Sequence, residues 1–287
     1  MAQTEQKNQN VKKQFEELQS LLERAMALQT SMVLFEWDDE TLAPKGAAEH
    51  TARVIGSLSE QYQEILASMR FKELLDVCLK AEKENAGVFD EVQSAILREA
   101  AEEQERLSCI PPEEYRAYAE LTACATGIWT RAREKNDFAS FAPVLKEIIS
   151  YQKKFAAYRA KPGQKLYDVM LDTYEKGFNM EMLDPFFELM KGKIVPLLKE
   201  SAERSKMVPD AFLSADYPEA AQAEVARFLA EYEGFDFDRG VLALSAHPFT
   251  TNLHNHDVRI TTHYQKRIDS SIFSVLHETG HAIYEFG

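Results

Sequence analysis

The sequence predicts a mainly α-helical protein with a small antiparallel sheet beside a helix that carries the motif H-E-x-x-H. Three observations predict this fold class. Apolar residues recur with a helical period from residue 11 onwards, alternating β-branched segments follow between residues 240 and 264, and an apolar run fills residues 270–287. We therefore expect one continuous fold, with a helical body (1–235) followed by a region of sheet and motif helix (236–287).

The first helix begins near Val11. Glu and Lys residues lie on one side of it, and the opposite side carries an apolar stripe formed by Phe15, Leu18, Leu22, Ala25 and Met26. Its continuation ends at the break made by Pro44 and Gly46.

Further helices follow from the same period. Pro112 marks one helix start, because Pro suits the first turn and the acids Glu113 and Glu114 interact favourably with the helix dipole. Aromatic and Met residues in the stripes indicate a core rather than a cofactor site. The stripes run through residues 55–69, 74–81, 92–107, 115–129, 141–158 and 182–198.

Composition excludes several classes of protein. The chain has 33 Lys and Arg against 47 Asp and Glu, a formal net charge of -14, which disfavours a nucleic-acid partner. Its three cysteines are widely spaced and read as reduced thiols. The amino terminus is polar, and no apolar run is long enough to cross a membrane. We expect a cytoplasmic protein.

The motif H-E-x-x-H predicts a metal site. His277 and His281 lie one helical turn apart, so both imidazoles face one side of a helix and reach a single metal. Glu278 projects about 100° away, where a general base for an activated water belongs. Because the surrounding run is apolar, we expect this helix and its imidazoles to be buried, with Asp269 and Ser270 as N-cap residues.

Four further histidines gather just upstream of the motif and suggest the wall of an active site: His247, His254, His256 and His263. The string His254-Asn255-His256 also matches the letters of the HNH nucleases. A nuclease is disfavoured, because such enzymes spread their catalytic residues over a larger unit and because the net charge is negative.

With these residues in view, the chain resembles the thermostable, Taq-type zinc carboxypeptidases. Three motifs carry the resemblance by their order and spacing, namely His247-Pro248-Phe249, Asp257-x-Arg259-x-Thr261 and His277-Glu278-x-x-His281. Further landmarks near Trp37 and Tyr174 extend the likeness over most of the chain. Two positions depart from the family, which commonly has Arg at His263 and Gln at Phe286.

The resemblance implies a zincin-like, mostly helical fold with a deep groove, a homodimer, and removal of single residues from the C-termini of peptide substrates. It implies zinc (Zn2+), or another divalent ion such as Co2+, bound by His277 and His281, with Glu278 as the catalytic base. The family takes its third metal ligand, a Glu, from a later helix beyond residue 287. We therefore expect an incomplete fragment of a longer enzyme.

Substrate binding is assigned to the segments before the motif helix. Arg259 is the expected partner of a substrate carboxylate, because a guanidinium pairs with two oxygens at once. An ion pair with Asp257 or Asp269 is the alternative for Arg259. The further candidates for the substrate wall are Asp257, Thr261 and His247.

Three functions stay open from sequence: a metallocarboxypeptidase, an endopeptidase on the same scaffold, and an inactive helical module for interaction or dimerisation. Two imidazoles supply half of a tetrahedral zinc shell, so we expect the 287-residue chain alone to be metal-poor and inactive. Glu285 does not complete the shell, because it lies about 12 Å along the helix from His277. One of the upstream histidines is the remaining internal candidate.

Overall fold

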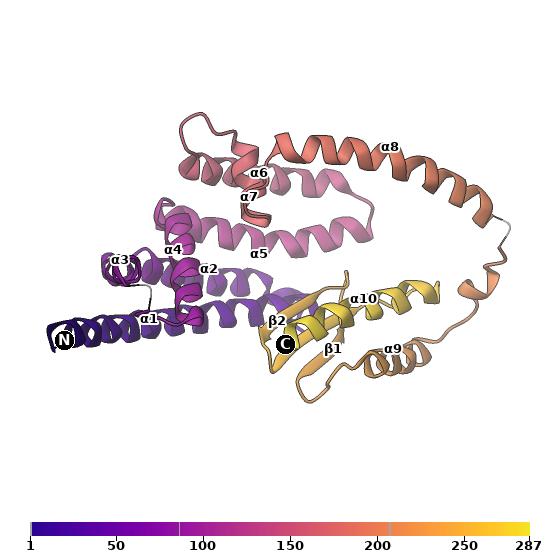
Figure 1. Cartoon of the computed structure of the whole chain (residues 1–287). Helices are drawn as coiled ribbons and strands as arrows, with labels where there is room; N and C mark the ends of the chain where they lie inside the picture. The colour runs from indigo at the N-terminus through magenta and orange to yellow at the C-terminus, as the bar shows by residue number, and fades with distance from the viewer. Residues whose placement is uncertain (1, 86, 207) are drawn as a thin grey trace. The chain divides into compact units, whose positions relative to one another are not determined.

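The structure, a computed structural model, describes residues 2–85, 87–206 and 208–287 and confirms a mainly helical fold with a small sheet (Figure 1). The helices are α1 (Ala2–Thr41), α2 (Ala48–Leu66), α3 (Met69–Glu84), α4 (Glu91–Ser108), α5 (Pro112–Glu134), α6 (Phe138–Arg159), α7 (Leu166–Tyr174), α8 (Met180–Ser205), α9 (Glu219–Glu233) and α10 (Ile268–Phe286). The strands are β1 (Gly240–Leu244), β2 (Thr250–His254) and β3 (Asp257–Thr262), and short 3-10 turns cover Lys45–Ala47 and Ala211–Ser214.

Packing divides the chain into two compact units. The first contains residues 1–39 and 43–161, and the second contains residues 40–42 and 162–287. This division by contacts falls after residue 161, whereas the predicted boundary at 235/236 marks the change from helix to strand. The 235/236 boundary stays a prediction about domains.

The core of the first unit gathers side chains from its first four helices. Leu18 of α1, Phe71 of α3 and Leu97 of α4 are fully buried in it. The predicted stripe of α1 is confirmed for three of its members, since Phe15, Leu18 and Ala25 are buried, and Leu22 is partly buried against the same core. It is wrong for Met26, which is 60% exposed. Met26 follows Ala25 directly and is therefore turned about 100° away from the buried stripe.

Local capping explains where several of these helices begin. The Ser68 side chain accepts a hydrogen bond from the Phe71 amide at the start of α3. Asp90 and Gln93 form a reciprocal capping box at the start of α4. Pro112 is the first residue of α5, as predicted.

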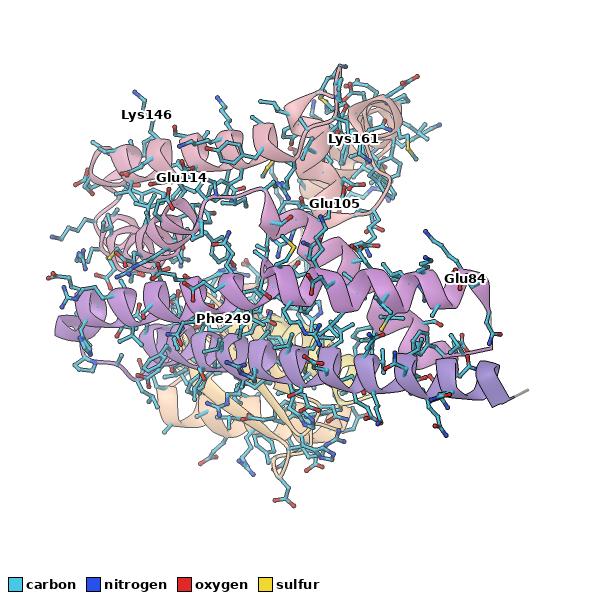
Figure 2. The ribbon with its side chains drawn as sticks, turned by 90° about the vertical axis from the view of Figure 1, so that its left-hand side faces the viewer. Glu84, Glu105, Glu114, Lys146, Lys161 and Phe249 are labelled. Atoms are coloured by element: carbon cyan, nitrogen blue, oxygen red, sulfur yellow. The ribbon has the colours of Figure 1, made fainter. Side chains whose placement is uncertain are left out.

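Two buried or half-buried polar groups tie helices together in the first unit. Gln63 of α2 donates from Nε2 to the carbonyls of Leu107 and Ile110, at 3.1 and 2.6 Å, and so closes the end of α4. Glu114 of α5 lies toward α6 (Figure 2) and accepts hydrogen bonds from Lys154 Nζ at 2.5 Å and the Tyr158 hydroxyl. The Lys154 ammonium lowers the pKa of Glu114.

The sheet of the second unit is mixed, which corrects the prediction of an antiparallel sheet. The strand order is β1-β3-β2. β2 pairs antiparallel with β3, as a short hairpin requires, but β1 pairs parallel with β3. The turn through residues 245–249 carries the chain past the place that β3 later fills, so β2 reaches the far edge. Alternation along a strand identifies the strand without specifying its neighbour.

Helix α10 packs on one face of this sheet, and α9 packs against α10. Their shared core contains Ala226 and Ala230 of α9, Val258 and Ile260 of β3, and Val275 of α10. Small residues on α9 allow α10 to approach closely.

Arg239 fastens the end of α10 to the sheet. Its guanidinium donates to the Phe286 carbonyl at 2.7 Å and to the Asn255 carbonyl, and it lies 4.7 Å from the centre of the Phe286 ring. The hairpin turn, the start of β1 and the last turn of α10 are thereby joined. Phe286 is buried against Phe235.

The structure can be compared with two expectations drawn from composition, on the cysteines and on membrane-spanning helices. The cysteines are free thiols, and burial raises the pKa of Cys78 to about 11. Among the described residues, no helix combines the length and the apolar character that crossing a bilayer requires.

Replacing Phe71 by Ala is expected to lower the free energy of unfolding by about 3–5 kcal/mol, because this fully buried ring would leave a cavity in the core. Phe138→Ala is the matched control, since its ring is 67% exposed, and it should change stability by about 0.5 kcal/mol or less. Urea denaturation followed by circular dichroism measures both. Equal losses would contradict the assigned core.

Candidate active site

Helix α10 is half buried, and this corrects the expectation of a buried helix with buried imidazoles. Glu278 is buried, at 7% exposed, together with Val275, Thr279 and Ala282. His277 and His281 are exposed. The reason is the helical period, because residues 275, 278, 279 and 282 form one stripe against the sheet and α9, and the imidazoles lie beside that stripe.

The start of α10 also differs from the prediction. The helix begins at Ile268, with Arg267 at the N-cap position and no side-chain cap. Asp269, predicted as an N-cap residue with Ser270, lies in the first turn and pairs with the Arg267 guanidinium at 3.0 and 3.2 Å. That hydrogen bond lowers the pKa of Asp269. The Asp269 carboxylate thus accepts hydrogen bonds from Arg267 and does not serve as the N-cap of α10.

The two imidazoles of the motif converge on one point. Their Nε2 atoms are 3.1 Å apart, and the rings are nearly perpendicular. Two nitrogens in a tetrahedral zinc shell, each about 2.0–2.1 Å from the metal, lie about 3.3 Å apart. The spacing of the two Nε2 atoms therefore suits His277 and His281 as two ligands of one zinc ion.

A third ligand is not gathered around this pair in the part of the chain that the structure describes. No group of three His, Cys, Asp or Glu side chains there could hold a metal. Glu285, set aside as a ligand from its distance along the helix, accepts a hydrogen bond from the Asn252 amide. The assignment of the third ligand stays a prediction.

Glu278 is held by a residue that the sequence reasoning missed. The Thr250 hydroxyl, at the start of β2, donates to Glu278 Oε2 at 2.6 Å and lies 3.2 Å from the Glu278 carbonyl. Thr250 directly follows the His247-Pro248-Phe249 motif. That adjacency was the one sequence signal that could have identified it.

Arg259 forms an ion pair with Asp257, the alternative that sequence reasoning left open. Two hydrogen bonds of 2.8 Å join the groups, and Asp257 raises the pKa of the guanidinium. Residues alternate between the faces of a strand, so Arg259 lies on the face opposite Val258 and Ile260, which pack with α10. The structure therefore does not bring Arg259 together with the imidazole pair.

Thr261 holds the turn that leads into β2. Its buried hydroxyl oxygen accepts a hydrogen bond from the Phe249 amide at 3.0 Å and lies 2.7 Å from the Ser245 hydroxyl oxygen. The Ser245 hydroxyl donates to the His247 carbonyl at 2.7 Å. The His247 side chain itself is exposed on this turn. Thr261 thus contributes by positioning the backbone.

The other upstream histidines do not form one cluster. His254 and His256 stack on each other at the hairpin turn, with ring centres 5.5 Å apart. His263 follows the opposite end of β3, where its Nδ1 lies 2.9 Å from the Ser245 carbonyl. The predicted wall is therefore divided between the turn of the hairpin and the end of β3.

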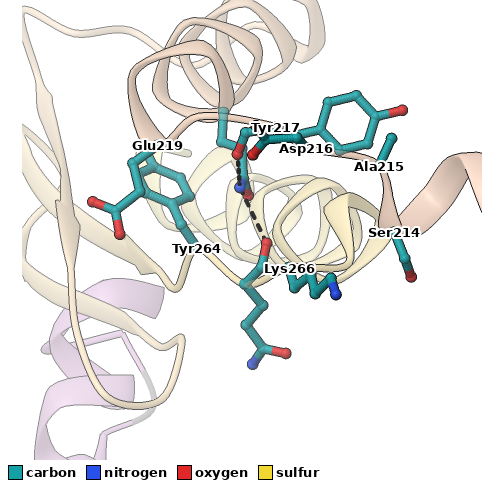
Figure 3. Close-up of a pocket in the computed structure, with 9 residues that line it drawn as sticks. Ser214, Ala215, Asp216, Tyr217, Glu219, Tyr264 and Lys266 are labelled. Carbon is teal, nitrogen blue, oxygen red and sulfur yellow. Dashed lines mark hydrogen bonds between the residues drawn. The ribbon is translucent and has the colours of Figure 1, made fainter.

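A separate hollow of about 630 Å³ lies at the start of α9, beside the segment before α10 (Figure 3). The buried Gln222 closes it by donating to the carbonyls of Tyr217 and Gln265 at 2.9 and 3.1 Å. Burial, and then the Glu219 carboxylate, raises the pKa of Tyr264 on its wall. None of the residues predicted for the site lines this hollow.

Comparisons with known proteins place the chain among peptidases. Residues 17–287 match the family described as Carboxypeptidase Taq (M32) metallopeptidase. The chain is 35% identical over 266 residues to Carboxypeptidase 1 of Bacillus subtilis (strain 168), covering 92% of this chain and 52% of that protein. It is 34% identical over 283 residues to Thermostable carboxypeptidase 1 of Thermus thermophilus, with coverage of 94% and 55%. The chain thus spans about half the length of the curated relatives it matches.

Solved structures agree with these matches. The structure named "BsuCP Crystal Structure" superposes with a TM-score of 0.89 at 34% identity, over 95% of this chain and 54% of that one. Trypanosoma cruzi metallocarboxypeptidase 1 superposes with a TM-score of 0.78 at 31% identity, over the same shares. The similarity therefore extends beyond local motifs to the fold of most of this chain.

Proposed function

Since this chain belongs to the carboxypeptidase Taq (M32) metallopeptidase family, we propose that the complete protein is a metallocarboxypeptidase that releases single residues from the C-terminal ends of peptides. The term complete protein denotes the full product of the gene that encodes residues 1–287. The observation that carries the proposal is the pair of imidazole nitrogens 3.1 Å apart on α10, with Glu278 adjacent on the same helix.

His277 and His281 would hold the metal, for which we propose zinc, with cobalt as a working substitute. A bound divalent ion supplies Lewis-acid polarisation of a peptide carbonyl and lowers the pKa of a water. The resemblance assigns the third ligand to a Glu beyond residue 287, and we keep this assignment within the proposal. For residues 1–287 tested alone we expect weak metal binding and no turnover.

Glu278 would move the protons of the reaction. Its Oε2 accepts the Thr250 hydroxyl, while Oε1 has no hydrogen-bond partner among the described residues. Oε1 is therefore the oxygen that takes a proton from the attacking water and passes it to the leaving amine. Burial of the Glu278 side chain between α10 and the sheet limits its motion during this transfer.

The substrate is proposed to be a peptide with a free C-terminal carboxylate. Arg259 is retained as its proposed partner, with Asp257 and His247 as further wall residues, and Thr261 supports them through the turn. The side chains of Arg259 and Asp257 are 19% and 40% exposed, so a substrate carboxylate can compete with Asp257 for the guanidinium.

We also propose a cytoplasmic homodimer, with neither nucleic acid nor membrane as a partner.

Release of amino acids from defined peptides tests the proposal. The complete protein is incubated with zinc or cobalt and an N-blocked peptide, and products are identified by mass spectrometry. We expect free C-terminal residues to appear one at a time, and an otherwise identical peptide with an amidated C-terminus to resist. Internal fragments from both peptides would support an endopeptidase instead, and no cleavage of either would support an inactive interaction module.

A further inference from the structure

Strand β2 points two polar side chains at α10. Thr250 pairs with Ile260, and Asn252 pairs with Val258, across the antiparallel ladder. Paired residues project from the same face of a sheet. Because Ile260 and Val258 are fully buried in the core shared with α10, Thr250 and Asn252 face that helix too.

Each of these side chains donates to a different glutamate of α10. Thr250 reaches Glu278 Oε2 at 2.6 Å, and the Asn252 amide reaches Glu285 Oε2. The two glutamates are seven residues apart, or about 10 Å along the helix axis. Only the first bond involves the motif. The strand therefore supplies two similar contacts, one to the proposed base and one outside the site.

We propose that Thr250 is a positioning residue, which fixes the Glu278 carboxylate beside the imidazole pair and leaves Oε1 toward the substrate. This proposal rests on the function proposed above. A glutamate side chain has three rotatable torsions, so a hydroxyl 2.6 Å from one oxygen removes much of its freedom. The same hydroxyl lies 3.2 Å from the Glu278 carbonyl, which ties the strand to the helix backbone at this residue.

The position of Thr250 is itself fixed from β3. The Thr261 amide donates to the Phe249 carbonyl at 2.9 Å, and the Phe249 amide donates to the Thr261 hydroxyl oxygen at 3.0 Å. These two bonds anchor the residue immediately before Thr250. The threonine of the D-x-R-x-T motif thereby acts on Glu278 through Phe249 and Thr250. A sequence motif on the sheet face opposite α10 is in this way connected to the motif helix.

Three variants of the complete protein separate positioning from stability. Thr250→Val keeps the shape of the side chain and removes the donor, whereas Thr250→Ser keeps the donor. Asn252→Leu is the matched control, because it removes the neighbouring bond between the same strand and helix. We expect kcat to fall about 10–100-fold in Thr250→Val with KM changed about 2-fold or less, and to stay within about 3-fold in Thr250→Ser and Asn252→Leu.

Two further measurements do not depend on turnover. Metal content should be unchanged in all three variants, because none of them alters an imidazole. Crystal structures should show the Glu278 carboxylate displaced by about 1 Å or more in Thr250→Val and unmoved in Thr250→Ser. An unmoved carboxylate in Thr250→Val, or an equal loss of kcat in Asn252→Leu, would overturn the proposal. If the complete wild-type protein releases no residues, the proposed function fails, and the crystal structures alone decide on positioning.

Discussion

Glu278→Gln in the complete protein is expected to lower kcat by about 10²–10⁴-fold while leaving the metal content unchanged. The amide keeps the size of the carboxylate and its acceptor oxygen toward the Thr250 hydroxyl, but it cannot take a proton from water. Metal analysis and a C-terminal residue-release assay on the same preparation measure the two effects. A variant with full activity would sink the assignment of Glu278 as the base.

Glu285→Gln provides the control for this prediction. Glu285 lies on the same helix and also accepts a hydrogen bond from β2, through Asn252, but it stands two turns away from Glu278. The same chemical change there should leave kcat within about 2-fold of the wild type, because surface changes away from a site have small effects. A comparable loss in both variants would indicate damage to α10 rather than the removal of a base.

Replacing His277 or His281 by Ala is expected to weaken zinc binding by more than about 100-fold and to remove activity with it. The reason is that the two Nε2 atoms lie 3.1 Å apart, where both suit the proposed metal position, so each substitution removes one proposed ligand. Loss of a partner outside the ligand shell already costs about 10–100-fold. Competition with a chelator measures the affinity, and elemental analysis after gel filtration measures the stoichiometry.

His256→Ala is the matched substitution for the metal experiment. His256 is an exposed histidine at the hairpin turn, stacked on His254 and outside the motif helix α10. It should retain the zinc affinity of the wild type. Loss of zinc in this variant, or retention of zinc in His281→Ala, would show that the metal is held elsewhere among the histidines.

The placement of the motif side chains was predictable because it depends on the geometry of one helix. A spacing of four residues places His277 and His281 on one side of any α-helix, whatever packs around it. The exposure of the imidazoles was not predictable in the same way. An apolar run of residues indicates burial, but only the neighbours of α10 decide which stripe is covered, and here they cover Glu278 and leave the imidazoles exposed.

The contacts of the sheet show more clearly what could not be predicted from sequence. The D-x-R-x-T pattern drew attention to Arg259, whose guanidinium pairs with Asp257 on the face away from α10. Thr250 is the residue that reaches Glu278, although 28 positions separate the two. Its role depends on the register of β2 against β3, and a shift of one residue would turn it to the other face.

The sequence by itself determined the helical class, the location of the strands near the end of the chain, and the pair of imidazoles beside a glutamate. These features follow from local periods of 3.6 and two residues, which a single segment carries within itself. Only the tertiary structure decided the parallel pairing of β1 with β3, the exposure of His277 and His281, and the contact of Thr250 with Glu278. These depend on which segments meet, and that choice belongs to the packing of the whole unit.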